Sequence, residues 1–217
     1  MSLDYLFEHW REILNLTGDH LRLTLTAIAY ALVVAVPLGV VTARLRPLTL
    51  PVFGLLDALY TIPSLAFLAL LIPWRGLGED NALVVLATYA QIFLVRNIVV
   101  ALRGVSPMTL EAARGLGMTS WQVFRKVRWP LALPVMAAGL RTAVVTTISL
   151  ATVAAWINAG GLGTLLFTGL GRGEHGTSQI LAGTIAITAL AILADAILRL
   201  LERFTSAARA ERAGRRG

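Results

Sequence analysis

Cysteine is absent from this sequence, and charged residues make up only 14% of its 217 residues. Without cysteine the chain can form neither a disulfide framework nor a thiolate metal site. The three histidines, His9, His20 and His175, are far apart and form no HExxH pair. The only lysine, Lys126, follows Arg125 at the position where a GxxxxGK[ST] phosphate-binding loop requires glycine. We therefore expect no metal site, no bound cofactor and no nucleotide hydrolysis by this chain.

Hydrophobic residues are abundant instead: they make up 57% of the chain, and its mean hydropathy is +0.74. Soluble domains are roughly 45–50% apolar and about 25% charged, so this composition is typical of a membrane protein. A helix needs about 20 apolar residues to cross a bilayer. Five stretches are long enough: Leu21–Ala43, Leu48–Trp74, Asn81–Leu102, Leu131–Trp156 and Ser178–Leu201. The predicted fold class is an all-α polytopic membrane helical bundle with five transmembrane helices.

The basic residues are distributed unevenly around these stretches. Most follow the first, third and fifth stretches, whereas the remaining connections hold Arg11, Arg22, Arg75 and Arg172. Because basic loops stay in the cytoplasm, the N-terminus is expected outside and the C-terminus in the cytoplasm. Residues 1–20 would be an extracellular segment, 21–201 the transmembrane domain with a cytoplasmic loop at 103–130, and 202–217 a basic cytoplasmic tail near membrane lipid. The net charge of +7 then reflects topology, and no nucleic-acid partner is expected.

The second stretch is interrupted at Tyr60-Thr61-Ile62-Pro63-Ser64. Pro63 lacks a backbone donor and clashes with the preceding turn, so the helix should kink or break near the middle of the membrane. Broken backbone at that depth survives only against protein or beside a water-filled cavity. The interruption indicates either a helix that lines a translocation path or a packing kink. If it lines a path, the candidate path residues are Tyr60, Thr61, Pro63, Ser64, Asn97 and Asn158.

Four charged residues lie inside apolar stretches, where an unpaired charge costs about 2.5–3.5 kcal/mol. Asp195 has Arg199 four residues later, which favours an i,i+4 pair. Asp57 and Arg141 lie about 13 Å and about 16 Å from the cytoplasmic ends of their helices, at 1.5 Å per residue. Because these depths match, we expect an ion pair between Asp57 and Arg141, with Arg96 as the competing partner.

The longest hydrophilic segment connects the third and fourth stretches. Its Ser106-Pro107 pair is typical of a helix start, and Glu111 follows in the early turns, where the helix dipole favours a carboxylate. Gly115 and Gly117 should end this helix, and the Thr119–Gln122 capping-box pattern should open a second short helix. Such a loop is either a docking element for a groove in a soluble partner or an ordinary loop at the lipid headgroups.

The segment Glu111–Pro134, EAARGLGMTSWQVFRKVRWPLALP, resembles the EAA loop of permease subunits in bacterial ATP-binding-cassette importers. The matching positions are Glu111, Ala112, Ala113, Gly117, Leu131 and Pro134. Four further motifs are similar to the subgroup that imports glycine betaine, choline, carnitine and related osmoprotectants: TIPSLA at 61–66, VRN at 95–97, GLRTA at 139–143 and AGGLG at 159–163. One departure is the segment Tyr89–Leu94, which lacks a proline that many relatives carry.

This resemblance implies the type I importer permease fold and a place in the bacterial cytoplasmic (inner) membrane. Two permease subunits, identical or similar, would form the path between them, and an extracytoplasmic substrate-binding protein would deliver the solute. Two cytoplasmic ATP-binding subunits would hold the ATP and Mg²⁺ and grip the EAA helix, so the permease itself would have no catalytic site. The implied ATPase-coupling residues are Glu111, Ala112, Ala113, Arg114, Gly115, Gly117, Leu131 and Pro134.

Several alternatives remain open on the sequence alone. The solute could be another small molecule such as an amino acid, and five helices could form a channel-type pore as an oligomer. A membrane-embedded enzyme would need a convergent catalytic set, and the chain has neither a GxSxG elbow nor a histidine pair. Quaternary ammonium groups are usually held by aromatic rings. Tyr60, Tyr89 and Trp156 are candidates, although such residues also anchor helices at membrane interfaces.

Overall fold

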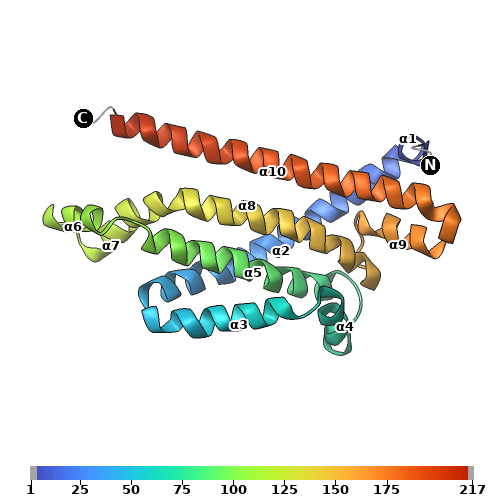
Figure 1. Cartoon of the computed structure of the whole chain (residues 1–217), viewed down its shortest axis with the longest axis horizontal. Coiled ribbons are helices and arrows are strands. Elements are labelled where there is room, and N and C mark those ends of the chain that lie inside the picture. Colours follow the sequence, from blue (N-terminus) through green and yellow to red (C-terminus); the bar gives the residue numbers. More distant parts are fainter. Residues whose placement is uncertain (1–3, 215–217) are drawn as a thin grey trace.

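The computed structural model describes residues 4–214, and the side chains of residues 5–202. Every regular element within this range is a helix, as Figure 1 shows, which confirms the all-α fold class. In chain order the elements are α1 (Asp4–Glu8), α2 (Trp10–Arg44), η1 (Arg46–Leu48), α3 (Thr49–Thr61), α4 (Ser64–Arg75), α5 (Glu79–Arg103), α6 (Pro107–Gly115), α7 (Ser120–Val123), η2 (Phe124–Arg128), α8 (Trp129–Ala154), η3 (Ala155–Ile157), α9 (Gly163–Gly171), η4 (Gly173–Gly176) and α10 (Thr177–Gly214).

The predicted apolar stretches coincide with the long helices. Within residues 4–214, four helices are long and apolar enough to cross a membrane, and α3 with α4 forms a fifth candidate that bends by 93°. The break lies where Pro63 predicts it: α3 ends at Thr61, Ile62 is extended, and α4 begins at Ser64. Two of the helices are longer than the apolar stretches. Helix α2 begins at Trp10, inside the expected extracellular segment, and α10 continues to Gly214. Most of the expected basic tail is therefore described as backbone, whereas its side chains beyond Glu202 and the whole of residues 215–217 lie outside the described residues.

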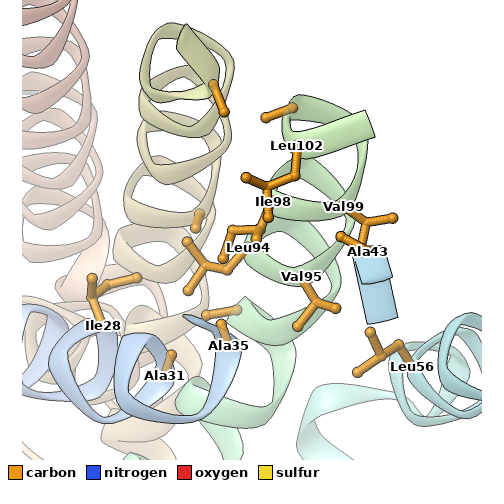
Figure 2. Close-up of a cluster of buried hydrophobic side chains, with 14 of the residues drawn as sticks. Ile28, Ala31, Ala35, Ala43, Leu56, Leu94, Val95, Ile98, Val99 and Leu102 are labelled. Carbon is orange, nitrogen blue, oxygen red and sulfur yellow. The ribbon is translucent and has the colours of Figure 1, made fainter. Parts of the chain in front are cut away.

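Helix α5 is the centre of the bundle, because it packs against α2, α3, α4 and α8. Close packing against α2 depends on a stripe of small residues at four-residue spacing, namely Ala27, Ala31, Ala35, Gly39 and Ala43. A Cβ atom at Gly39 would lie 2.6 Å from Ile98 Cγ2, so only glycine permits this approach. Figure 2 shows Ala31 and Ala35 in one cluster with Leu94, Val95 and Ile98 of α5.

The bundle has two ends of different character. At one end, which we call the α6 end, α2 and α5 terminate and α6 and α7 project. At the opposite end, the α9 end, the chain between α4 and α5 meets the end of α8, since the Gly78 amide donates to the Ile157 carbonyl at 2.7 Å. Arg22 and Glu79 form an ion pair of 2.7 Å at the same end. Figure 1 shows α6 and α7 opposite α4 and α9 along the long axis.

Candidate functional site

Helix α6 begins and ends as the sequence predicts. Ser106 is the residue before the helix, and Pro107 occupies the first turn, although the Ser106 side chain makes no capping hydrogen bond. At the other end the Gly117 amide donates to the Arg114 carbonyl (2.9 Å) and the Met118 amide to the Ala113 carbonyl (3.3 Å). This pair of bonds is the Schellman motif, which requires a left-handed residue, and Gly117 has φ +78°. The glycine therefore fixes the direction in which the chain leaves α6.

Most of α6 has no packing partner within the described chain. Ala113 is its only buried residue, whereas Met108 and Leu116 are 79% and 84% exposed. Glu111 and Ala112 are also exposed, and within residues 5–202 no hydrogen bond or ion pair involves the Glu111 carboxylate. An isolated nine-residue helix with exposed apolar side chains is marginal in water. Its surface is suited to a contact with another molecule.

The second helix begins where the sequence predicts, but the expectation that it is short is wrong. The Thr119 capping box is present, with the Thr119 amide bonded to Gln122 Oε1 at 2.8 Å, but the helix it opens runs on through η2 and α8 from Ser120 to Ile157. The segment η2 is a π-helical turn in which the Trp129 amide reaches the Phe124 carbonyl. A wide turn is favourable before Pro130, since proline cannot donate the next helical hydrogen bond. The loop is therefore one short helix, α6, set on the base of α8.

Two arginines hold the base of this loop. Arg103 donates to the carbonyls of Thr42 (2.7 Å) and Ala43 (3.2 Å) and to the Thr49 hydroxyl (2.7 Å). Arg128 Nε donates to the Leu102 carbonyl at 2.8 Å. The accepting carbonyls lie in the last turns of α2 and α5, where no amide of the same helix is available. The sequence indicates only that these arginines belong to a basic loop, because nothing in it shows which helix ends lie beside them.

The eight predicted coupling residues fall into two groups. Six lie on α6 and its terminal turn, from Glu111 to Gly117. The other two lie on α8: Leu131, which is 50% exposed, lines a hollow with Ser106 and Thr109, and Pro134 is half-buried within the helix. Leu131 therefore lies beside the start of α6, whereas the six residues from Glu111 to Gly117 form α6 itself and its terminal turn.

The break between α3 and α4 is supported by an aromatic cluster. The Tyr89 hydroxyl donates to the Ile62 carbonyl, one of the groups that the break leaves without a helical partner. Tyr60 meets the rings of Tyr89 and Phe93 edge-on, at centroid distances of 5.6 and 5.8 Å. Tyr89 is only 5% exposed, so it supports the break and does not present its ring face to a path. Helix α5 continues through residues 89–94 without interruption.

The candidate path residues do not form one cluster. Tyr60, Thr61 and Pro63 are exposed and Ser64 is half-buried, all at the break. Asn97 donates to the Phe93 carbonyl at 2.8 Å and packs against Gly139 of α8, where a Cβ atom would lie 2.3 Å from Asn97 Cβ. Asn158 is exposed at the α9 end, in a left-handed conformation with φ 62°. Asn97 therefore lies in the contact between α5 and α8, whereas Tyr60, Thr61, Pro63 and Ser64 lie at the break.

The expected Asp57–Arg141 ion pair is wrong. Asp57 pairs with Arg96, the competing partner, whereas Arg141 Nε lies 3.7 Å from carboxylate oxygens of both Asp195 and Glu202. The pair does not form because α5 packs against both α3 and α8 and so lies between Asp57 and Arg141. Depth along each helix predicts which charged residues lie at the same level of the bundle, but it does not predict which helices are neighbours. The Asp195–Arg199 pair is confirmed, at 2.7 Å.

Comparisons with known proteins agree with this architecture. Two solved chains share the fold: one in inward-facing conformations of the MetNI methionine ABC transporter (TM-score 0.79, 22% identity, 94% of this chain and 99% of that chain) and one in an amino acid ABC transporter with histidines (TM-score 0.76, 17% identity, 94% and 98%). The fold is therefore that of a type I ABC importer permease, a multi-pass membrane protein. A family model described as "binding-protein-dependent transport system inner membrane component" matches residues 35–207, and the chain belongs to that family.

Relatives in this family are similar over nearly the whole chain. The glycine betaine/carnitine/choline transport system permease protein OpuCB of Bacillus subtilis (strain 168) is 40% identical over 192 residues, 88% of each chain. The osmoprotectant import permease protein OsmW of Salmonella typhimurium (strain LT2) is 39% identical over 206 residues, 93% of this chain and 95% of the relative. The similarity therefore covers the break, the central helix α5 and the whole α6 loop.

Proposed function

We propose that this chain is the permease subunit of an ATP-driven importer for osmoprotectants such as glycine betaine, choline or carnitine. The observation that carries the proposal is the identity of about 40% over 88% of both chains to a permease named for these solutes. The likeness to methionine and amino acid transporters is below 25% identity and supports the fold alone. Family membership also favours an importer over a channel-type pore.

In this proposal the α6 end faces the cytoplasm, and two ATP-binding subunits dock there and hydrolyse ATP with Mg²⁺. The density of arginine at this end supports the orientation. The exposed Glu111 carboxylate can accept charge-assisted hydrogen bonds from an ATPase subunit, and the small Ala112 permits close approach. An extracytoplasmic binding protein delivers the solute at the α9 end, and a second permease subunit completes the path.

The arginine contacts suggest how movement of α6 reaches the bundle. Arg103 joins the end of α5 to the end of α2, and Arg128 joins the base of α8 to the end of α5. A displacement of the loop is therefore passed to three long helices together instead of bending the loop alone. Rocking of these helices would convert closure of the ATP-binding subunits into a change between inward-open and outward-open states.

We place the solute path at the break between α3 and α4. Tyr60, Thr61 and Pro63 are exposed there, and Tyr60 is 41% exposed. Aromatic rings attract quaternary ammonium groups through cation–π interaction. Trp156, 50% exposed near the end of α8, would act at the outer rim.

The test is uptake by the assembled importer in proteoliposomes, with labelled choline or glycine betaine and ATP inside. We expect Glu111→Ala to lower uptake and substrate-stimulated ATP hydrolysis by about 10- to 100-fold, since a charge-assisted bond contributes roughly 1.5–3 kcal/mol. The matched control is Glu174→Ala, another exposed carboxylate, at the α9 end, which should leave both rates unchanged.

Three results would contradict the proposal. Normal uptake by Glu111→Ala would remove the docking role of α6. Full-speed uptake in vesicles without ATP-binding subunits would favour a channel-type pore. Uptake of an amino acid that choline, carnitine and glycine betaine do not inhibit would leave the importer in place and replace its solute class.

A further inference from the structure

An apolar groove of about 590 Å³ lies at the α6 end, between α2 and the base of α8. Its apolar wall is formed by Val36, Val40, Val41, Trp121, Phe124 and Trp129. Arg44 and Arg125 also line the groove. Trp121 is 62% exposed and Val41 45% exposed, so these side chains lack a cover within the described chain.

A second, cationic pocket of about 380 Å³ adjoins this groove. It is lined by Arg44, Arg114 and Arg128 together with Ser120, and it shares Arg44, Trp121 and Phe124 with the groove. The two hollows are therefore two parts of one concave surface. One part is apolar, the other carries guanidinium groups and a hydroxyl, and Arg44 lies where they meet.

Among residues 5–202, these arginines have no carboxylate partner. The guanidinium of Arg44 lies 4.8 Å from the centroid of the Phe124 ring, and within residues 5–202 no carboxylate forms an ion pair with Arg44, Arg114 or Arg125. The described ion pairs belong to other parts of the bundle. Guanidinium groups gathered around one pocket repel one another, so an anion bound among them would be stabilised.

The length of the groove indicates which kind of anion this surface binds. Val36 precedes Arg44 by two helical turns, so the apolar wall extends about 12 Å along α2 from the arginine toward the centre of the bundle. A soluble protein that docks on α6 cannot reach apolar surface inside the hydrocarbon region. The occupant must combine an anionic group with an apolar chain more than about 10 Å long.

We propose that this surface binds an anionic phospholipid, with its phosphate and headgroup among Arg44, Arg114 and Ser120 and one acyl chain along the groove beneath Trp121 and Trp129. Tryptophan at the rim suits the headgroup level of a bilayer. The inference uses the proposed orientation, in which the α6 end faces the cytoplasmic leaflet, where anionic lipid provides the partner. It is a site with defined walls, distinct from the general attraction of basic loops to lipid.

The experiment measures lipid retention directly. The permease, assembled with its ATP-binding subunits in detergent, is incubated with dioleoyl phosphatidylglycerol or dioleoyl phosphatidylcholine, and retained lipid is counted by native mass spectrometry. We expect retention of phosphatidylglycerol and not of phosphatidylcholine. Arg44→Gln should weaken retention about fivefold, which corresponds to about 1 kcal/mol for one arginine near a lipid headgroup, and Arg44→Gln with Arg125→Gln about 25-fold.

Matched variants separate a site from diffuse charge. Arg44→Lys keeps the charge and should retain most of the binding, and Arg172→Gln removes an exposed arginine at the α9 end and should change nothing. Val41→Trp fills the groove without a change in charge and should lower retention as Arg44→Gln does. Equal effects of Arg44→Gln and Arg172→Gln, or no effect of Val41→Trp, would overturn the site.

Two further outcomes bear on the occupant. Displacement of the lipid by millimolar inorganic phosphate would mean that the pocket selects an anion without its acyl chain, which contradicts the proposal. Retention by the permease alone that is lost when the ATP-binding subunits bind would assign the arginines to protein carboxylates. Because retention is measured without transport, a complex that imports choline but shows no preference for phosphatidylglycerol refutes only this inference, and the reverse result refutes only the proposed function.

Discussion

The loop between α5 and α8 and the turn between α8 and α9 both bend at glycine, yet their surroundings differ. At the α6 end, Gly117 has φ +78°, and no atom would lie within 4 Å of an added Cβ. At the α9 end, Gly161 has φ +77°, and an added Cβ would lie 2.9 Å from His20 Nδ1; at Gly163 it would lie 2.1 Å from the Thr152 carbonyl oxygen. Gly117 is required by backbone geometry alone, Gly161 by backbone geometry and by space, and Gly163 by space alone.

This difference separates two mechanical roles. The α8–α9 turn is packed against α2 and α8, with His20 fully buried and bonded to the Ile148 carbonyl at 2.9 Å, so it moves with the bundle. Helix α6 contacts the bundle through the buried Ala113 and the half-buried Leu110, and most of its other residues are exposed. A partner can therefore engage α6 without disturbing the core, whereas any change at the α9 end must alter the packing of three helices.

The largest effect that would test this comparison is expected at Gly163. In Gly163→Ala the new methyl group meets the backbone oxygen of Thr152, which cannot turn aside as a side chain could. We expect a loss of about 3 kcal/mol in the free energy of unfolding, or failure to accumulate folded protein. The measurement is the yield and thermal midpoint of detergent-extracted protein.

The control for this variant is Gly54→Ala in α3, where no atom lies within 4 Å of an added Cβ. It should be neutral or stabilising by about 0.5–1 kcal/mol, because alanine favours helix. If Gly163→Ala proved as stable as Gly54→Ala, the α8–α9 turn would be looser than the structure describes and the contrast between the two ends would fail.

An intermediate effect is expected at Arg103, which joins the α6 end to the core. Arg103→Ala removes the guanidinium group that donates hydrogen bonds to three oxygens, two of which are carbonyls at the end of α2. We expect about 2 kcal/mol of destabilisation and faster hydrogen exchange of amides near the ends of α2 and α5. Arg172→Ala is the matched control, because Arg172 is exposed at the α9 end and should show neither change. Unchanged exchange in Arg103→Ala would mean that the clamp is not needed to hold the loop.

The features of the α6 loop that could be predicted from the sequence are those with a local cause. A left-handed glycine, a capping box and a proline at the first turn act within a few residues, and Gly117, Thr119 and Pro107 all occupy the predicted positions. The break at Pro63 is local in the same sense. The continuity of α7, η2 and α8 could not be predicted, because a proline such as Pro130 ordinarily ends or kinks a helix and here the π-helical turn η2 accommodates it.

Features that depend on which helices are neighbours could not be predicted. Depth along each helix placed Asp57, Arg96 and Arg141 at one level, but only the position of α5 between α3 and α8 decides which pair forms. The same is true of Arg103 and Arg128, whose acceptors are carbonyls about 60 and 26 residues away in sequence. The close approach of Asn97 to Gly139 of α8 is likewise a contact between helices that the sequence does not reveal.

The smallest effect on stability, and the sharpest test of the contrast, is expected at Gly117. Gly117→Ala meets no neighbouring atom, so the cost is that of a left-handed alanine, about 1 kcal/mol, and the protein should remain folded. The chain can avoid that cost by changing the direction in which it leaves α6, which would misplace Glu111 relative to a docked ATPase subunit. We therefore expect substrate-stimulated ATP hydrolysis to fall at least tenfold in Gly117→Ala while the thermal midpoint changes little. Gly117→Asn should retain more activity than Gly117→Ala, because asparagine tolerates the left-handed region. Equal activity of the alanine and asparagine variants would show that the direction of α6 does not matter for coupling, and α6 would then be a passive contact instead of a positioned one.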